Sequence, residues 1–356
     1  MIHTKNLSQK FKGRGTNQNP ANRFDKIEYI AEPNDSFEDE KRPQTEYFKD
    51  TAKTIVTFND SPDLGRGASL NVYRGCEHGC IYCYARPSHE YLSLSAGLDF
   101  ETKIFVKPEA PKLLYKTLAS KKWKPLTIMM SGNTDCYQPV EKKLMLTRGC
   151  LEVLHKFHNP VSIVTKNRLV TRDIDILSKM AEYKTVSVFI SITSLDNRLA
   201  SVMEPMTTKP HLKLEAIKEL SSAGIPTGIL IAPVIPGLTD AEIPEIIKHA
   251  VDAGAKQAAF VMLRLPHGLK DLFLNWLETY FPERKQKIIN RLTELYDGKL
   301  YDSTFFVRGR GKGPYADQVR DIFKLSCRKY GMNKDPFKLT TEYFTNPEGE
   351  QLNLFG

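Results

Sequence analysis

The chain has 356 residues, of which 41% are hydrophobic and 26% charged, a composition typical of a soluble protein with one large domain or two. It contains no run of 18 apolar residues and its amino terminus lacks an apolar signal stretch, so the sequence predicts a cytoplasmic protein with no membrane partner. Six cysteines are too few for a disulfide scaffold, and the net charge of +9 is compatible with a polyanionic partner without requiring one.

The first segment of the chain has the composition of a solvated arm. Residues 1–26 carry six Lys or Arg against one Asp and show no helical or strand periodicity, and residues 31–50 are acidic. We therefore predict a flexible N-terminal arm over residues 1–61.

In the next segment, short β-branched stretches alternate with amphipathic ones. The predicted strands are 70–73, 126–130, 161–165, 186–193, 226–235 and 258–265. The predicted helices between them are 111–120, 142–157, 172–183, 210–223 and 241–253. This alternation indicates a parallel sheet, either doubly wound or forming part of a barrel, with functional residues at the carboxyl ends of the strands.

The pattern is less regular toward the C-terminus. Residues 272–295 predict one or two helices, and residues 305–330 carry seven Lys or Arg against two Asp. We predict a basic, mainly helical extension over residues 306–340 and a flexible tail over residues 341–356, which is polar until the final QLNLFG.

Three cysteines follow the first predicted strand in the sequence CEHGCIYC, as Cys76, Cys80 and Cys83. Such a short, glycine-containing loop can place three thiolates around one soft metal centre. A structural zinc ion is the alternative, but it needs a fourth ligand, and the nearby His78 lies between two ligands of the same short loop. Three ligands favour an iron–sulfur cluster with one iron open to a substrate or cofactor.

This loop, with Tyr82 just before its last cysteine, resembles the signature of the radical S-adenosylmethionine (SAM) superfamily. The stretches NVYRGCEHGCIYCYA and SGNTDCYQPVE are similar to the bacterial branch related to spore photoproduct lyase, often labelled DNA-repair-photolyase-like. The resemblance implies a partial (β/α)6 barrel of the TIM type over residues 62–305. It also implies a [4Fe–4S] cluster that reduces SAM to methionine and a 5′-deoxyadenosyl radical, with the electron coming from a donor such as a flavodoxin or ferredoxin.

The resemblance also implies a set of SAM contacts at the strand ends. The segment after the second strand would hold the SAM ammonium group, although the common Gly-Gly-Glu is replaced here by SGNTD. Lys166 would pair with the SAM carboxylate, with an exposed lysine at the rim as the alternative. Ser191 would bind the ribose, and Glu204 is either a second polar contact or a surface acid. The stretch around Ile235 would pack on the adenine. The implied cofactor-binding residues are Tyr82, Tyr84, Ser131, Gly132, Thr134, Asp135, Lys166, Ser191 and Ile235.

The other cysteines have weaker predicted roles. Spore photoproduct lyase carries a hydrogen-donating cysteine on the second-strand loop, where this chain has Gly132. Cys136 lies four residues on and is the candidate substitute. Cys150 and Cys327 fall in helical patterns and are expected to be plain thiols.

Two C-terminal features point to a nucleic-acid partner. Residues Gln351, Leu352, Leu354 and Phe355 resemble the peptide that bacterial repair proteins insert into the replication sliding clamp, with a self-packed tail as the alternative. Arg308, Arg310 and Lys312 on a glycine-rich loop suit phosphate contacts, with a solvated loop as the alternative. We therefore expect a radical SAM enzyme that acts on DNA or another nucleic acid, in repair or base modification. The rival hypotheses are modification of a protein or small molecule, and a non-catalytic cluster-bearing DNA sensor.

Overall fold

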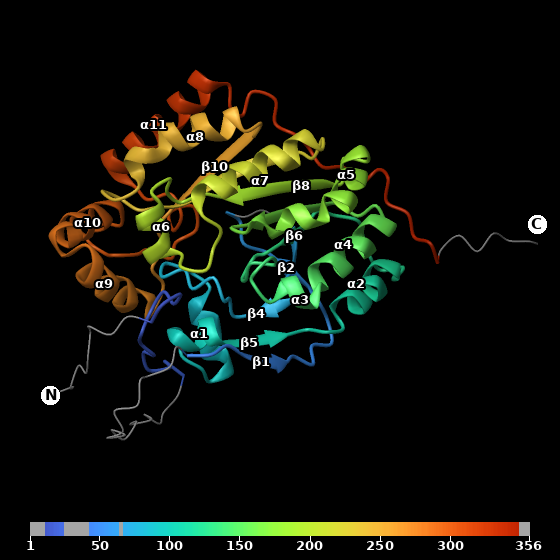
Figure 1. The fold of residues 1–356 in the computed structure, drawn as a ribbon, viewed down its shortest axis with the longest axis horizontal. Coiled ribbons are helices and arrows are strands. Elements are labelled where there is room, and N and C mark those ends of the chain that lie inside the picture. The colour runs from blue at the N-terminus through green and yellow to red at the C-terminus, as the bar shows by residue number, and fades with distance from the viewer. Residues whose placement is uncertain (1–10, 25–42, 64–66, 349–356) are drawn as a thin grey trace, which may run out of the picture.

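The computed structural model describes residues 11–24, 43–63 and 67–348. Its centre is a curved seven-stranded sheet with the strand order β10-β9-β8-β7-β6-β3-β2 (Figure 1). Every neighbouring pair is parallel except β2 with β3, which are antiparallel. The strands are β2 (Val56–Asn59), β3 (Gly67–Leu70), β6 (Ile128–Met130), β7 (Val161–Thr165), β8 (Val186–Ser191), β9 (Thr227–Val234) and β10 (Gln257–Met262).

Helices follow the parallel strands and cover the outer face of the sheet. They are α2 (Ala110–Ala119), α3 (Glu141–Leu144), α4 (Leu146–Lys156), α5 (Ile174–Glu182), α6 (Asn197–Met203), α7 (Pro210–Ser222) and α8 (Ile243–Asp252). In α4 the buried residues Thr147, Cys150, Leu151 and Leu154 recur at helical spacing, which explains why the sequence predicts a helix here. The predicted helix over 142–157 is divided at Met145, whose φ of 53° ends α3. The partial barrel of alternating strands and helices is confirmed.

A second, three-stranded sheet lies beside the barrel. It has the order β1-β5-β4 and consists of β1 (Glu46–Lys49), β5 (Lys103–Val106) and β4 (Tyr73–Arg74), with α1 (Leu98–Thr102) and the short 3-10 helix η1 (Arg86–Leu92) packed nearby. Strands β1 and β2 fall inside the segment expected to be an arm, so this part of the chain differs from the expectation. All four side chains of β1 are exposed, so the strand carries no apolar alternation that the sequence could show.

The C-terminal part of the chain adds three helices. Helices α9 (Leu269–Tyr280) and α10 (Pro282–Leu295) divide the stretch expected to hold one or two helices, and α11 (Gly313–Tyr330) packs on α8 and α10 (Figure 1). None of the described helices is long and apolar enough to cross a membrane.

The described residues after α11 cross the amino ends of the barrel strands. The backbone N–H groups of Asn333, Thr340 and Thr345 donate to the carbonyls of Lys256, Lys184 and Phe157, which precede β10, β8 and β7. The Asn346 side chain donates to the Ala119 carbonyl at 3.0 Å. This strap, residues 333–346, therefore lies at the end of the barrel opposite the strands' carboxyl ends.

Candidate cofactor site

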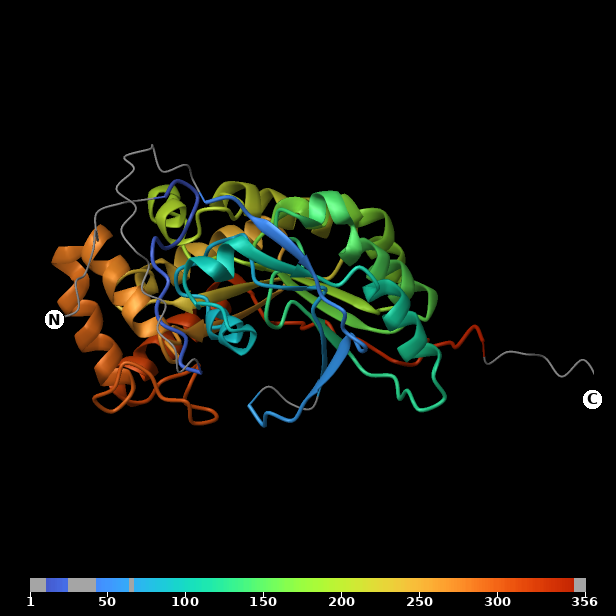
Figure 2. The same cartoon turned by 90° about the horizontal axis from the view of Figure 1, so that it is seen from below.

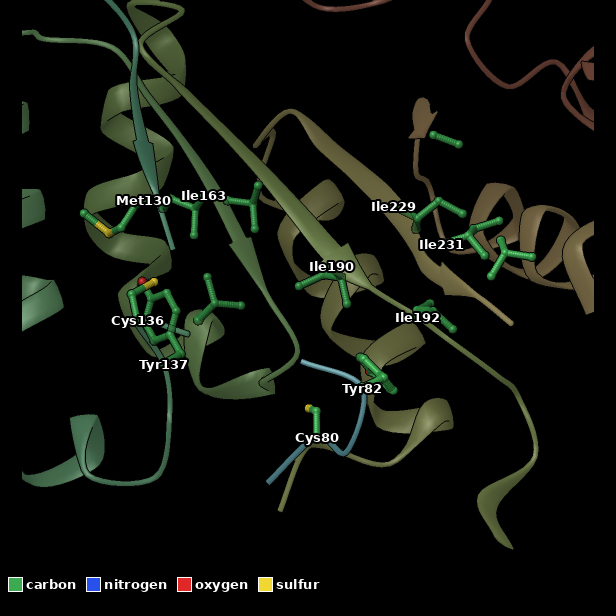
Figure 3. Packing of buried hydrophobic residues seen from close by; sticks show 14 of the residues in the cluster. Cys80, Tyr82, Met130, Cys136, Tyr137, Ile163, Ile190, Ile192, Ile229 and Ile231 are labelled. Carbon is green, nitrogen blue, oxygen red and sulfur yellow. The ribbon is translucent and has the colours of Figure 1, made fainter. Parts of the chain in front are cut away.

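The three cysteines of the CEHGCIYC loop lie next to β4, at the carboxyl ends of the barrel strands. Cys76 and Cys80 are 7% exposed and Cys83 is partly exposed. Figure 3 shows Cys80 and Tyr82 on this loop, with Tyr82 beside Ile192 at the end of β8. The loop thus presents its thiols where a parallel barrel places its functional groups.

The loop is held by backbone contacts and by one buried arginine. The Cys76 N–H donates to the Phe100 carbonyl and the Ile81 N–H to the Met203 carbonyl. Arg86, which is fully buried, donates to the carbonyls of Cys80 and Gly79 and pairs with Glu101 at 2.5 Å. These contacts fix the loop before any cofactor binds.

Gly79 in the middle of the loop has a φ of 66°, in the left-handed region that glycine adopts without strain. A Cβ atom there would lie 2.8 Å from a Glu101 carboxylate oxygen and 3.2 Å from the Gly15 nitrogen. Residues of the N-terminal segment thus pack directly against the loop. Gly15 donates to the same Glu101 carboxylate at 2.9 Å.

Burial raises the pKa of each of the three thiols, and the charges of neighbouring groups add to the shift for Cys76 and Cys80. Each thiol is close enough to another of the three for their charges to interact. Three thiolates could not coexist here without a cation, so this donor set fits a positively charged metal centre.

The ligand count of the loop argues against a structural zinc ion. Such a site needs four protein ligands, and the loop offers three thiols. Within the described ranges, no three His, Cys, Asp or Glu side chains form a site for one metal ion. Three thiolates would leave one iron of a [4Fe–4S] cluster without a protein ligand, which is the arrangement that the sequence predicts.

His78 does not point toward the thiols as a fourth ligand. Its Nδ1 lies 3.4 Å from an Asp135 carboxylate oxygen, and its Nε2 lies 3.1 Å from the Asn167 side-chain amide. Both ring nitrogens are occupied by these contacts, so His78 joins the cysteine loop to the loops that follow β6 and β7.

The loop after β6 contains Ser131, Gly132, Thr134 and Asp135. Asp135 is surrounded by donors: it accepts hydrogen bonds from Thr165 Oγ1 at 2.7 Å and from the Lys166 N–H at 2.7 Å. Burial would raise the pKa of Asp135, but the His78 charge and these hydrogen bonds lower it. The Asp135 carboxylate therefore joins these loops, and the backbone N–H of Asp135 donates toward the Cys76 thiol.

The other residues of this loop are also tied down. Ser131 has a φ of 82° and accepts a hydrogen bond from the Cys136 N–H at 2.9 Å. The Thr134 hydroxyl lies 3.4 Å from the Tyr73 carbonyl, and the Gly132 carbonyl accepts from the Tyr84 hydroxyl at 2.5 Å. Their predicted contact with SAM stays a prediction.

Lys166 and Ser191, predicted from their places at strand ends, lie together. The Lys166 ammonium group donates to Ser191 Oγ at 2.6 Å and to the Ala232 carbonyl at 3.1 Å, and it lies 3.5 Å from Glu204. It also sits 5.5 Å from the centre of the Tyr82 ring. The ends of β7, β8 and β9 thus meet beside the cysteine loop.

Glu204 is a buried member of this group, and sequence reasoning did not separate it from a surface acid. Tyr82 and Thr193 donate to one of its oxygens, and Lys213 donates to the other at 2.8 Å. Burial would raise the pKa of Glu204, but the charges of Lys213 and Lys166 hold it well below its usual range. Lys213 itself was missed, because a lysine within a polar helix gives no sign of burial.

Tyr84 and Ile235 lie at different depths. Tyr84 is 45% exposed, and Arg264 lies over its ring with the guanidinium carbon 4.7 Å from the ring centre. Desolvation raises the pKa of Tyr84, and the charges of Arg264 and Arg308 partly offset the shift. Ile235 is fully buried at the end of β9, where its N–H donates to Thr239 Oγ1. Arg264 was another residue that sequence reasoning missed.

Cys136 does not face the strand ends. It is 2% exposed and belongs to the hydrophobic core, where Figure 3 shows it beside Tyr137 and below Met130. Burial raises its pKa. This placement speaks against the predicted role of Cys136 as a hydrogen-atom donor. Cys150 and Cys327 are also buried thiols, as expected.

The basic loop is only partly available for a partner. Arg308 forms two contacts with the Asp63 carboxylate, at 2.7 and 2.5 Å, so its guanidinium already has an acidic partner, and its predicted contact with phosphate stays a prediction. Lys312 lies 3.5 Å from Asp297, and Arg310 is exposed. Gln351, Leu352, Leu354 and Phe355 lie outside the described residues, so the structure does not bear on their predicted role.

Comparison with known proteins adds an independent finding. Residues 70–250 match the family described as the Radical SAM superfamily, and this range holds all three cysteines of the loop. An uncharacterized protein of Methanocaldococcus jannaschii is 32% identical over 239 residues, which cover 67% of this chain and 86% of that protein. An uncharacterized protein of Mycobacterium tuberculosis is 34% identical over 230 residues, 64% of this chain and 66% of the relative, just under two thirds of its length.

Solved structures show the same fold. Spore photoproduct lyase complexed with dinucleoside spore photoproduct superimposes with a TM-score of 0.59 over 81% of this chain and 80% of that one, at 15% identity. A mutant of that enzyme with bound AdoMet and the same dinucleoside gives a TM-score of 0.56, also at 15% identity. At this identity the likeness establishes the architecture alone.

Proposed function

The chain belongs to the radical SAM superfamily and is an enzyme of that class, and from this premise we propose that Cys76, Cys80 and Cys83 hold a [4Fe–4S] cluster with SAM bound beside it. The family implies SAM and an iron–sulfur cluster. The observation that carries the cluster assignment is the set of three desolvated thiols on one anchored loop at the carboxyl ends of the strands.

The bound cluster and SAM would supply an electron and a sulfonium bond whose cleavage gives methionine and a 5′-deoxyadenosyl radical. The protein's own residues would position these groups. The Lys166 ammonium, beside Ser191 and the cysteine loop, supplies positive charge for the SAM carboxylate, and Ser191 supplies a hydroxyl for the ribose. Tyr84, which is 45% exposed, offers a ring for the adenine, and Ile235, buried after β9, is the apolar contact that the family resemblance implies.

We further propose that the substrate is a nucleic acid, with DNA repair or base modification as the outcome. The net charge of +9 and the exposed Arg310 beside the mouth support this proposal. So does the fold shared with an enzyme whose solved complex contains a dinucleoside photoproduct. Met129 of β6 is 43% exposed although the strand is paired on both sides, so one face of this strand is open to solvent and could meet a substrate.

The first experiment is an anaerobic assay on the full chain. The protein is reconstituted with iron and sulfide and reduced, SAM is added, and 5′-deoxyadenosine is quantified by mass spectrometry with and without ultraviolet-damaged DNA. Replacing Cys76, Cys80 or Cys83 by Ala should remove the cluster absorbance and the nucleoside, whereas Cys327→Ala, a cysteine outside the loop, should retain both.

Each arm of this assay can contradict one part of the proposal. A full cluster absorbance in Cys80→Ala would contradict the cluster assignment. Nucleoside formation that DNA does not stimulate would contradict the nucleic-acid substrate and favour a protein or small-molecule substrate. A reduced, intact cluster that never cleaves SAM, even with cell extract added, would favour the non-catalytic sensor.

The sequence at the end of the chain supports a separate proposal, that the bacterial sliding clamp recruits this enzyme through Gln351, Leu352, Leu354 and Phe355. The strap that precedes this peptide crosses the amino ends of the strands, so clamp binding would leave the opposite, cysteine-bearing end accessible. Deleting residues 351–356 should abolish capture by immobilised clamp and leave 5′-deoxyadenosine formation unchanged. Clamp capture by the truncated chain would contradict the proposal.

A further inference from the structure

Arg264 is a partly buried arginine at the mouth of the barrel. It follows the last barrel strand, β10, by two residues, and its guanidinium lies over the ring of Tyr84, the residue after Cys83. Its Nε atom is enclosed and has no hydrogen-bond partner. Enclosing a charged donor without an acceptor is costly, because the lost water is not replaced.

Three other arginines that are partly or fully buried have acidic partners. Arg86 pairs with Glu101 at 2.5 Å, Arg172 with Glu141 at 2.9 Å, and Arg308 with Asp63 at 2.5 Å. Within the described part of the chain, no carboxylate lies within ion-pair distance of Arg264. The contact that the described residues give its guanidinium is the face of the Tyr84 ring. An aromatic face attracts the cation but accepts no hydrogen bond in the plane of the guanidinium.

The surroundings keep the Arg264 side chain in place. The Tyr84 hydroxyl donates to the Gly132 carbonyl at 2.5 Å, so the ring beneath Arg264 is held between the cysteine loop and the loop after β6. The Leu263 carbonyl accepts from the Tyr296 hydroxyl at 2.9 Å, which fixes the backbone just before Arg264. A fixed, partly desolvated guanidinium is suited to two-pronged binding of an oxyanion.

We propose that Arg264 forms an anion subsite that binds a phosphate oxygen of the substrate at the barrel mouth. The inference rests on the proposed nucleic-acid substrate and deepens it, since it assigns the group that holds the backbone next to the reacting nucleoside. The phosphate would supply the counter-charge that the Arg264 guanidinium lacks.

The test measures binding of a fluorescein-labelled 12-nucleotide single-stranded DNA by the full reconstituted chain, at several salt concentrations. Arg264→Met should weaken binding about 10- to 100-fold, as expected for one lost charged contact, and should reduce the salt slope by about one phosphate. The DNA affinity of Arg264→Lys should lie between that of the unchanged chain and that of Arg264→Met. Arg328→Met, on the exposed face of α11, should bind like the unchanged chain. A neutral methylphosphonate strand should abolish the difference between the variants.

The outcomes separate this inference from the proposed function. Tight DNA binding that is equal in Arg264→Met and the unchanged chain would overturn the subsite and leave the nucleic-acid proposal standing. Binding of inorganic pyrophosphate that needs Arg264, without binding of the DNA, would support the anion subsite and contradict the nucleic-acid substrate. Weaker SAM binding with unchanged DNA binding would assign Arg264 to SAM and overturn the inference. Circular dichroism checks folding, and Arg264→Lys decides the result if the Met variant unfolds.

Discussion

Glu204 is a buried carboxylate that joins the cysteine loop to the barrel. It accepts from Tyr82 of the loop, from Thr193 after β8 and from Lys213 of α7, and its side chain is 1% exposed. A buried ion pair of this kind contributes little net stability over an apolar pair, but removal of one partner leaves an uncompensated charge. Because Glu204 joins Tyr82 to Lys213, the position of Tyr82 depends on a residue that is far from it in the sequence.

We predict that Glu204→Gln destabilises the fold by about 3–5 kcal/mol, because Lys213 is then buried without its counter-charge. Glu215→Gln, which removes a partner of Arg168 in an exposed ion pair, should cost less than about 1 kcal/mol. Urea unfolding followed by circular dichroism measures both. Equal urea midpoints for the two variants would show that the buried Glu204–Lys213 pair contributes no more to stability than the exposed Arg168–Glu215 pair.

The same residue predicts a pH dependence of stability. Since the pKa of Glu204 is lowered in the folded state, its contribution is present above the unfolded value of about 4.3 and is lost as the pH falls toward the lower folded pKa. The free energy of unfolding should therefore fall as the pH is taken from about 5 to 3. Glu204→Gln should show a shallower fall over that window, and parallel curves would contradict the assignment.

At this scale, residues whose location follows from their place on a strand were predictable, and residues whose surroundings depend on distant partners were not. Lys166 and Ser191 were expected to lie together because the carboxyl ends of neighbouring parallel strands meet. The ion pair of Arg308 was not predicted, because its partner Asp63 is 245 positions away in the chain. Arg264 was missed because no local sequence pattern shows that an arginine will lack an acidic partner in the folded protein.

Among the elements, the bounds of those that bury one face in the core could be predicted from the sequence. Strand β7 has the predicted bounds, and its burial alternates along the strand. Strands β8 and β9 are also close to their predicted ranges because they are buried for most of their length. Helix α6, seven residues long, was missed because it is too short to establish a period.

The strap after α11 shows how tertiary contacts can order a segment without regular structure. The Asn333 side chain accepts from the Ala258 N–H at 2.7 Å and donates to the Ala258 carbonyl at 3.0 Å, so it extends the pairing of β10. Phe337 and Phe344 contact the rings of Phe189 and Phe157. Polar composition led us to expect a flexible tail from residue 341, but the contacts of this strap come from four different strand–helix connections, which no local pattern encodes.

On the scale of the whole molecule, the sheet is open and its two ends must be held together. One end is β2 with β3, and the other is β10. The Gly309 carbonyl accepts from the Met262 N–H at 2.9 Å, which places the loop after α10 against β10. From that loop Arg308 reaches Asp63 and Ser61, in the connection between β2 and β3. Figure 2 shows this connection, in blue, on the same side of the molecule as the orange loops that follow α10.

The Arg308–Asp63 pair thus bridges the open side of the barrel beside Tyr84. Arg308 and Asp63 are 18% and 11% exposed, and the two-pronged contact lowers the pKa of Asp63, with the Arg308 hydrogen bond as the main cause. Because neither partner is fully solvated, the pair should be worth more than a surface ion pair.

A double-mutant cycle with Asp63→Asn and Arg308→Met tests whether this contact holds the ends of the sheet together. We expect a coupling free energy of about 1–2 kcal/mol, since the partners are partly buried and doubly hydrogen-bonded. The same cycle on Lys312 and Asp297, which are 51% and 71% exposed and belong to neighbouring loops, should give less than about 0.5 kcal/mol. Hydrogen exchange should report faster opening of β2 and β10 together in Arg308→Met, because loss of the bridge releases both ends at once. Faster exchange at β10 alone would mean that Arg308 serves only its own loop, and the open side of the barrel would then depend on the backbone contact of Gly309.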